Sequence, residues 1–331
     1  MRPIDIVGAG PAGSAAAITA CDLGCPVRLY EKSALPRHKV CGEFLSPGAR
    51  PVLEQLGVLA EAERLRPARI SRVELHFGRS RKSWNLAEEA WGLSRYALDD
   101  ILYRRALSAG AVHVREVWTA PAAAQDNRLI LARGRSTHVQ KGSRLFGFKA
   151  HFRGPVSDTV ELYFPPGGYA GVCGVEGGIT NVCGIASEKL LRKIDFDFDE
   201  LLRRWPMLAE RTRPLTRCWD WLSTGPLVFG EQFDAARNAY VAGDALGFID
   251  PFTGSGIQGG LVTGRMAGLA AARNVPVAEH VRLCKQALGR QYAAAGIFRG
   301  AVRAGLADWL ARFVPGRLLF YLTRPGGSIA A

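Results

Sequence analysis

Three glycines near the start of the chain have the spacing of a phosphate-binding turn. Gly8, Gly10 and Gly13 lie in GAGPAG, directly after a short apolar run at residues 4–7. In such a turn the first glycine permits a tight bend, the second lets the backbone approach a pyrophosphate, and the third lets a helix pack on the strand. Pro11 and Ala12 begin that helix, whose free N–H groups and positive dipole end suit phosphates. The pattern predicts a dinucleotide-binding turn.

An acidic residue follows where the ribose of a dinucleotide would lie. The order is strand, glycine turn, small-residue helix and a second strand at residues 27–30, and Glu31 ends that strand 18 residues after Gly13. Its carboxylate would accept hydrogen bonds from the adenosine ribose hydroxyls. Lys32 is assigned to the same site. Because all these features fall in register, the pattern is far more specific than the glycine spacing alone.

A second motif near the other end of the chain favours FAD over NAD. Residues 240–257 read YVAGDALGFIDPFTGSGI. A strand would deliver Asp244 to its carboxyl end, where the carboxylate can bind a ribityl hydroxyl. The loop at residues 251–256 enters a helix whose free N–H groups suit the negative charge that collects on a reduced flavin. The residues assigned to the cofactor here are Gly243, Asp244, Pro251, Gly254, Gly256 and Ile257.

With both motifs present, the chain resembles the FAD-dependent oxidoreductases that include aromatic hydroxylases, flavin halogenases and geranylgeranyl reductases. The likeness covers nearly all of residues 1–275. PRHKVCGEFLSPGA at 36–49 most resembles the C-G-G or C-G-E loop of the geranylgeranyl reductase branch, and ELYFPPGGYAGVCGV at 161–175 is similar to its substrate segment. The resemblance implies that Arg95 lies beside the flavin and its diphosphate. It also implies that Tyr163, Phe164 and Tyr169 contact the substrate.

The resemblance places the loop around Cys41 near the isoalloxazine ring. Arg37, Cys41 and Gly42 are therefore assigned to the cofactor site. The thiol could orient substrate or relay a proton to a carbon that accepts hydride, although a buried structural role is commoner for a free cysteine. Lys39 and Arg37 could offset the flavin's charge, or they could be solvated surface residues.

Three features of the sequence bear on the reaction. Where the hydroxylases carry an Asp-Gly motif that touches FAD and the nicotinamide cofactor, this chain has Arg133 and Gly134. NAD(P)H therefore stays only a possible electron donor. Trp219 and Trp221 resemble the W-x-W part of a halogenase signature, but no Ile-Pro follows them, which disfavours halogenation. The segment 119–127 is also short for the family's crossover meander.

The elements that must position these residues occur in separate pieces. We expect an α/β fold: a glutathione-reductase-like, three-layer FAD-binding domain with a parallel sheet, an inserted antiparallel sheet that forms the substrate domain, and carboxyl-terminal helices. The FAD-binding domain is expected at residues 1–72, 94–140 and 226–275. The antiparallel sheet is expected at residues 73–93 and 141–225, and the helical region at 276–331.

Composition and charge narrow the class of protein and its partners. Of the 331 residues, 48% are apolar, which is typical of a globular chain. The formal charge is +13, and residues 276–331 contribute 8 − 2 = +6 of it. No nucleic-acid-binding module is recognisable, so FAD phosphates or an anionic membrane surface are the expected partners of this charge. The cysteines and histidines lack metal-ligand spacing, so no metal is expected.

The two ends of the chain guide the expected location. The start leads directly into a strand without a signal peptide, and no apolar run is long enough to span a membrane. We therefore expect a cytoplasmic protein with possible peripheral membrane contact. An apolar stripe at Leu306, Trp309, Leu310 and Phe313 could cap the substrate cavity or lie on an anionic membrane.

Three functions remain open from the sequence. The first is an FAD-dependent reductase or dehydrogenase that transfers hydride from flavin N5 to an apolar substrate, which could be isoprenoid, lipid-like or polycyclic. The second is a monooxygenase that hydroxylates an aromatic or polyketide-like substrate. The third is a flavin-binding maturation partner without catalysis, suggested by Arg133.

Overall fold

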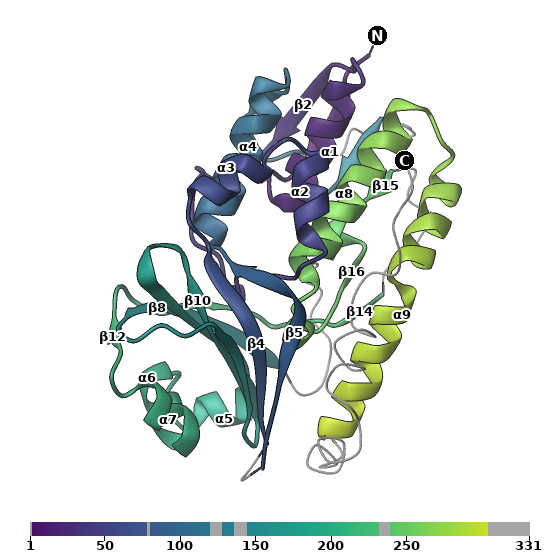
Figure 1. The fold of residues 1–331 in the computed structure, drawn as a ribbon. Helices are drawn as coiled ribbons and strands as arrows, with labels where there is room; N and C mark the ends of the chain where they lie inside the picture. The colour runs from purple at the N-terminus through teal and green to yellow at the C-terminus, as the bar shows by residue number, and fades with distance from the viewer. Residues whose placement is uncertain (1, 78–79, 120–127, 136–143, 232–238, 304–331) are drawn as a thin grey trace.

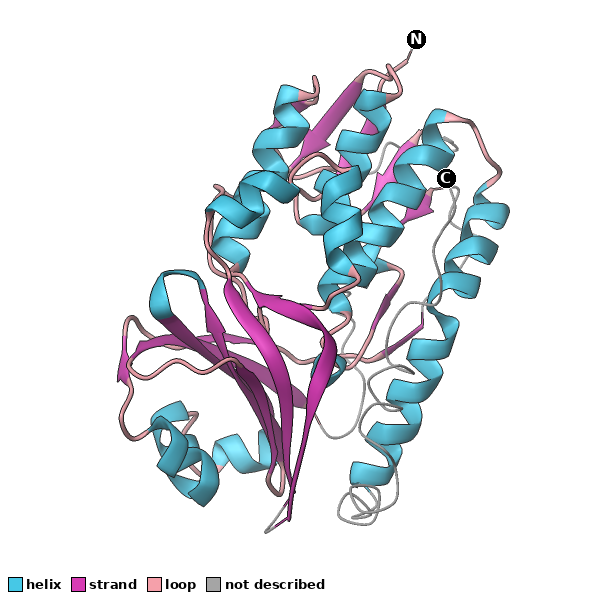
Figure 2. Ribbon diagram, in the orientation of Figure 1, coloured by secondary structure: helices cyan, strands magenta, loops and turns pink. Residues whose placement is uncertain are grey.

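The computed structural model describes residues 2–77, 80–119, 128–135, 144–231 and 239–303. Residues 120–127 of the short segment 119–127, and the apolar stripe beyond residue 303, lie outside these ranges. Two large sheets organise the described residues, with helices packed around the upper one in Figure 1. The predicted α/β fold, with one parallel and one separate, mainly antiparallel sheet, is confirmed (Figure 2).

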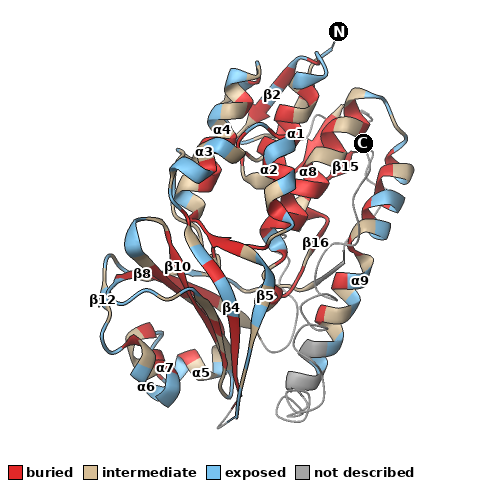
Figure 3. Cartoon of the chain, viewed as in Figure 1, coloured by how far each residue is buried: buried red, intermediate tan, exposed pale blue. Residues whose placement is uncertain are grey.

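The upper sheet is parallel, and short β-branched or leucine-rich strands form it. Its order is β15 (Tyr240–Val241), β7 (Leu129–Leu131), β1 (Ile4–Val7), β2 (Val27–Tyr30) and β6 (Val112–Val114). Helices α1 (Pro11–Asp22), α4 (Arg95–Ser108) and α8 (Gly256–Ala272) belong to this unit, together with α2 (Ala49–Gln55) and α3 (Leu59–Arg64). Buried residues concentrate along α1 and α8 (Figure 3), as expected for helices that pack against both a sheet and each other.

Helices α1 and α8 approach each other backbone to backbone. A Cβ atom added at Gly264 would overlap the carbonyl oxygen of Ala12, and one added at Gly268 would reach the carbonyl oxygen of Ala16. Only glycine permits such an approach. The helices that begin at the two sequence motifs are therefore fixed to one another, although the motifs lie at opposite ends of the chain.

The second sheet is mixed, because β9 and β4 pair in parallel while its other neighbours are antiparallel. Its order is β12 (Thr216–Arg217), β8 (Leu145–Arg153), β11 (Ile179–Ser187), β10 (Gly168–Val175), β9 (Thr159–Phe164), β4 (Ala68–Phe77), β5 (Ser80–Gly92) and β3 (Phe44–Leu45), with β13 (Leu222–Thr224) also on β8. Strand β4 begins before the domain boundary predicted between residues 72 and 73. That strand is therefore continuous across it.

Three short helices cover one face of the mixed sheet and leave the other face toward the parallel unit. They are α5 (Glu188–Arg192), α6 (Phe198–Arg204) and α7 (Pro206–Thr212), and their apolar residues pack on Phe148, Phe152 and neighbours of β8. The remaining short elements are β14 (Gly230–Glu231), β16 (Gly247–Phe248) and the 3-10 turns Glu176–Gly178, Gly243–Ala245 and Pro251–Thr253.

Helix α9 (Val277–Arg303) runs alongside the molecule (Figure 1). His280 contacts the carbonyl oxygen of Val241 through Nε2 at 3.0 Å, and the Tyr292 hydroxyl donates to the carbonyl oxygen of Gly247 at 2.5 Å. These contacts anchor α9 to the end of the parallel sheet and to the second motif. Among the described helices, α9 included, we find none with the length and apolar character required to cross a membrane.

Candidate functional site

A cavity of about 690 Å³ lies between the two units, and it is lined by residues that follow strands of the parallel sheet and by strands of the mixed sheet. Most of the residues assigned from the sequence are brought together here. Those that line the cavity are Gly8, Gly10, Pro11, Ala12, Glu31, Arg37, Cys41, Gly42, Arg95, Phe164, Tyr169, Gly243, Asp244, Pro251, Gly254, Gly256 and Ile257. Gly13, Lys32 and Tyr163 do not line it.

The first glycine turn has the geometry that its sequence predicts. Gly8 has φ +101°, and a Cβ there would meet the backbone of Ala132. A Cβ at Gly13 would overlap the carbonyl oxygen of Gly8, so Gly13 permits the helix to pack on the turn. Gly10 differs, because a Cβ there would meet only side-chain nitrogens of Arg95 and Lys39, at 3.6 and 3.8 Å. The backbone at Gly10 therefore opens toward two cations.

Glu31 is oriented by backbone groups at the end of β2. Its carboxylate accepts the Ala9 N–H at 3.2 Å and the Ser33 N–H at 3.0 Å, and the residue is buried at the cavity wall. A carboxylate held in this orientation can accept hydrogen bonds from ribose hydroxyls. Lys32 is exposed and lies outside the cavity lining, because successive residues in an extended segment point to opposite sides. Its assignment to the cofactor site has no support in this geometry.

A buried carboxylate organises the two cations beside Gly10. Asp99 accepts from Arg95 Nε at 2.6 Å and Nη2 at 2.8 Å, and from Lys39 Nζ at 2.7 Å. Burial would raise the pKa of Asp99, but the charge of Arg95 outweighs it and lowers that pKa. The group carries a net charge of +1, which suits a diphosphate. Lys39, which the sequence left between a flavin-binding and a surface role, is thus largely buried at the cavity.

The second motif supplies another uncapped helix start and an acid. Gly243 adopts φ +63° and its N–H donates to Thr263 Oγ1 at 2.9 Å, while Gly254 adopts φ +64° at the bend before α8. Neither α1 nor α8 has a side-chain cap at its amino terminus. Burial raises the pKa of Asp244, and the nearby charges of Arg95 and Arg135 oppose this shift.

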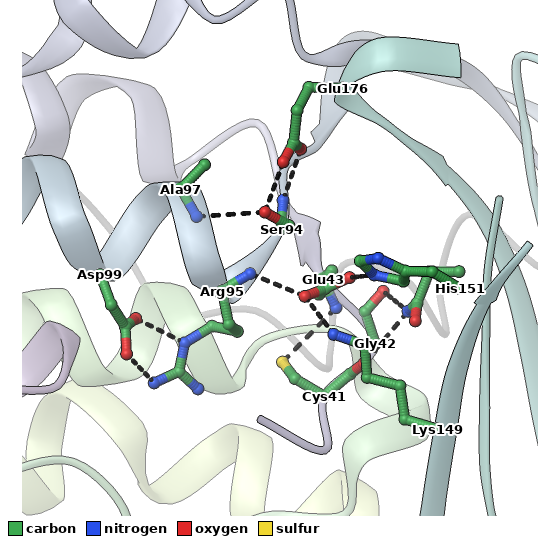
Figure 4. A network of polar contacts seen from close by, with 11 residues as sticks. Cys41, Gly42, Glu43, Ser94, Arg95, Ala97, Asp99, Lys149, His151 and Glu176 are labelled. Carbon is green, nitrogen blue, oxygen red and sulfur yellow. Dashed lines mark hydrogen bonds and ion pairs between the residues drawn. The ribbon is translucent and has the colours of Figure 1, made fainter. Parts of the chain in front are cut away.

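The Cys41 loop packs on the mixed sheet through polar contacts (Figure 4). Asn181 on β11 donates from Nδ2 to the carbonyl oxygens of both Cys41 and Gly42, each at 3.0 Å. Glu43, the next residue, is fully buried with φ +56° and contacts Lys149 and His151. Sequence reasoning missed Glu43, although its acidic side chain in KVCGE was a visible signal.

An apolar wall of the mixed sheet completes the cavity. Phe164 and Tyr169 have ring centroids 5.9 Å apart, and each lies 6.2 Å from Phe252 of the second motif. Further lining comes from Val73, Leu75, Val160 and Leu162. Tyr163 lies outside the cavity lining, because alternation along β9 directs its side chain to the opposite face. There it stacks on His76 at 4.2 Å and donates to Glu161 at 2.5 Å.

The departures seen in the sequence fall in two different places. Arg133 and Gly134 line the cavity together with Arg135, so the cation that replaces the hydroxylase carboxylate does border the site. Trp219 and Trp221 do not line it. Trp219 packs on His38 and His151, while the indole of Trp221 packs on β8 near helix α6.

The residues present fit FAD by their own chemistry. Two uncapped helix starts and a net positive cluster surround open backbone at Gly10, where a diphosphate can approach. Glu31 follows β2 and Asp244 follows β15, and these strands lie on opposite sides of β1 in the sheet. The two carboxylates thus offer hydrogen-bond acceptors for the ribose and the ribityl chain respectively.

Comparison with known proteins decides the family. No protein-family model matches the chain. The menaquinone reductase of Mycobacterium tuberculosis is 30% identical over 311 residues, covering 79% of this chain and 74% of that protein. The chain belongs to the same family, within the FAD-dependent oxidoreductases. The menaquinone reductase of Mycolicibacterium smegmatis is 26% identical over 316 residues, with the same shares covered.

Solved structures agree with the fold of this FAD-dependent oxidoreductase. The flavin-dependent brominase Bmp2 superposes with a TM-score of 0.80 at 17% identity, covering 96% of this chain and 92% of that one. A geranylgeranyl bacteriochlorophyll reductase-like protein from Thermoplasma acidophilum gives 0.74 at 18% identity, covering 97% and 95%. At these identities the likeness shows the fold alone. The predicted superfamily is confirmed.

Proposed function

We propose that this FAD-dependent oxidoreductase is a reductase of an apolar isoprenoid substrate, for which a prenylated quinone is a suitable example. The observation that carries the proposal is the two-sided cavity. One wall holds both flavin motifs, and the other is the apolar surface around Leu75, Leu162 and Phe164. An apolar pocket with few polar groups favours a large hydrophobic ligand. The relatives named menaquinone reductases support this class.

The residues of this chain would bind the cofactor, orient the substrate and deliver the proton. FAD, when bound and reduced by an electron donor, would supply a hydride at N5. The cluster of Lys39, Arg95 and Asp99 would bind the diphosphate, and the apolar wall would exclude water from the reacting carbon. Cys41 lies in the loop at the cavity wall, where its thiol can move a proton to the carbon next to the one that accepts hydride.

We also propose an electron donor and a source of substrate. Arg133 and Arg135 at the cavity suit the phosphates of NAD(P)H. On α9, Arg282, Lys285 and Arg290 are exposed, as is 73% of Ile297. A cytoplasmic enzyme could use this basic and apolar surface to contact an anionic membrane that contains the substrate.

Ligand titration tests the substrate class. A prenylated naphthoquinone should perturb the absorbance of the bound flavin at lower concentration than 4-hydroxybenzoate does. A clear preference for the benzoate would favour the monooxygenase and would overturn the apolar substrate.

Product analysis tests the reaction. The holoenzyme is reduced without oxygen, mixed with the prenylated naphthoquinone, and the product is weighed by mass spectrometry. A gain of two hydrogens that fragmentation assigns to the prenyl chain, and not to the quinone ring, supports the reductase. After oxygen is admitted, a gain of one oxygen atom, preceded by a transient absorbance band, would support the monooxygenase instead.

A further inference from the structure

The carboxylate of Glu43 joins three segments that are distant in the sequence (Figure 4). Its Oε1 accepts the Arg95 N–H at 2.7 Å, at the start of α4. The same oxygen pairs with the Lys149 ammonium, and Oε2 lies 2.6 Å from Nε2 of His151. Lys149 and His151 are neighbours on one face of β8. One side chain thus links the Cys41 loop, the FAD-binding unit and the mixed sheet.

The backbone of Glu43 extends this link to the thiol. The Glu43 N–H donates to Cys41 Sγ at 3.4 Å, and the Glu43 carbonyl oxygen accepts the Leu93 N–H at 3.0 Å. Glu43 has φ +56°, a conformation that is uncommon for a residue with a side chain. The contacts of the carboxylate fix this conformation. The position of Glu43 therefore helps to set where the sulfur of Cys41 lies, together with the Arg95 side chain, which also contacts it.

The charges in this link are costly to bury. Glu43 and Lys149 are both fully buried. Burial alone would raise the pKa of Glu43, but the hydrogen bond with His151 and the charge of Lys149 outweigh it and lower that pKa. An apolar pair of similar volume would serve stability as well or better. We therefore look for a role of this ion pair other than stability. The contact between the Glu43 N–H and Cys41 Sγ indicates that this role concerns the thiol.

A metal centre is the other interpretation of this cluster. His38, Glu43 and His151 place one ligand atom each within 4.8 Å of one another, a grouping that their spacing in the sequence did not predict. Two histidines and a carboxylate can bind a divalent metal. Here, however, Lys149 already neutralises the Glu43 carboxylate. A divalent ion would lie beside that ammonium in a buried site, so we assign no metal to it.

We propose that Glu43 is the positioning residue for the Cys41 thiol. Its carboxylate fixes the loop to α4 and β8, and its N–H then orients the sulfur at the cavity wall. The inference rests on the proposed function insofar as that wall must face the flavin. The positioning itself is a property of the protein alone and can be measured without substrate.

The test is Glu43→Gln, which keeps the shape of the side chain and removes its charge. In the apoprotein of this variant, iodoacetamide should alkylate Cys41 about five- to tenfold faster than in wild type. This factor corresponds to the loss of the local stability that one hydrogen bond contributes. Peptide mass spectrometry reports each cysteine separately, and the exposed Cys218 is the internal reference. In the holoenzyme the flavin potential should rise, because the Lys149 ammonium loses its counter-charge at the wall that the proposed function places beside the ring.

Glu176→Gln is the matched control. Glu176 accepts the Ser94 N–H at 2.7 Å and the Ser94 hydroxyl, so it also stabilises the start of α4, but no contact joins it to Cys41 among the described residues. This variant should lower the melting temperature and leave both the alkylation of Cys41 and the flavin potential unchanged. Equal effects of the two variants would reduce Glu43 to a helix-stabilising role and overturn the proposal.

A second variant keeps the test decisive if Glu43→Gln folds poorly. Glu43→Gln combined with Lys149→Met removes both buried charges and should fold, yet it still lacks the carboxylate. Wild-type alkylation of Cys41 in this double variant would overturn the proposal, whereas its flavin potential should return toward the wild-type value because the net charge is unchanged. If both readouts shift as expected but the prenylated naphthoquinone is neither bound nor reduced by wild type, the proposed substrate is wrong and the positioning role stands.

Discussion

The Lys39 ammonium lies 2.7 Å from the Asp99 carboxylate, although 60 residues separate them along the chain. Asp99 also pairs with Arg95, so one buried acid orients two cations beside Gly10. Cations that are already oriented lose little conformational freedom when an anion binds. The protein is thus preorganised for a diphosphate at the turn between β1 and α1.

Replacing Lys39 with methionine should weaken FAD binding. The aliphatic length is kept and one charge-assisted contact is lost, which corresponds to about 1.5–3 kcal/mol. Fluorescence titration of the apoprotein with FAD measures the change. Lys32→Met is the control, because Lys32 is exposed outside the cavity and its loss should leave the affinity unchanged. If the two variants bound FAD with equal affinity, the diphosphate would have to lie away from Lys39.

Two glycines of the first turn should respond differently to alanine. In Gly10→Ala the methyl group meets only side-chain nitrogens at 3.6 Å or more, so the apoprotein should melt near the wild-type temperature but retain little FAD. In Gly13→Ala the methyl group would overlap the carbonyl oxygen of Gly8, so the apoprotein itself should be destabilised. Calorimetry of both apoproteins, with flavin content after purification, checks this. A Gly10→Ala variant that stays fully yellow would contradict the expectation.

Asp99 should make the stability of the apoprotein depend on pH in acid. Its pKa lies below the ordinary value of 3.8, because the charges of Arg95 and Lys39 outweigh the effect of burial. Between the ordinary and the lowered value, the unfolded chain binds a proton that the folded protein does not. The free energy of unfolding therefore falls as the pH falls through this window.

Asp99→Asn removes that titration. Its free energy of unfolding should vary with pH less steeply, by up to about 1.4 kcal/mol per pH unit for one proton. Urea unfolding of both apoproteins at a series of acidic pH values measures the two slopes. Parallel curves would mean that Asp99 titrates alike in the folded and unfolded chains.

Phe164 and Tyr163 are neighbours on opposite faces of β9, so substitutions at the two positions should affect ligand binding differently. Phe164→Ala removes part of the cavity wall and should weaken the flavin-detected binding of a prenylated naphthoquinone. Tyr163→Phe should leave that binding unchanged and lower stability by about 1 kcal/mol through loss of the hydrogen bond to Glu161. A ligand affinity that changes only in Tyr163→Phe would show that the substrate lies on the other face.

Features that depend on short stretches of sequence could be predicted. The turn at Gly8 and the helix that follows it are local, and so is the loop before α8, because backbone conformation and helix starts are set by adjacent residues. The α/β fold followed from the order of such elements and is confirmed. Likeness to a known family supplied what local patterns lack, namely that the two ends of the chain share one cofactor.

Features that depend on register and distant contacts could not be predicted. The period of two in a strand shows that Tyr163 and Phe164 face opposite ways, but not which of them faces the cavity. The ion pair of Lys149 with Glu43 joins residues 106 apart, and spacing carries no information over that distance. For the same reason the sequence around Lys39 left a surface role open, and only the position of Asp99 in the structure shows the lysine beside a buried acid.

The contact between α1 and α8 also constrains the order of events during synthesis. The ribosome completes Ala12 long before it reaches Gly264, yet α1 and α8 pack through backbone atoms at those two residues. Until α8 emerges, the first motif has neither its packing partner nor the second uncapped helix start. A nascent chain is therefore unable to retain FAD until most of its length has left the exit tunnel. Flavin capture comes late and can report that the chain has folded.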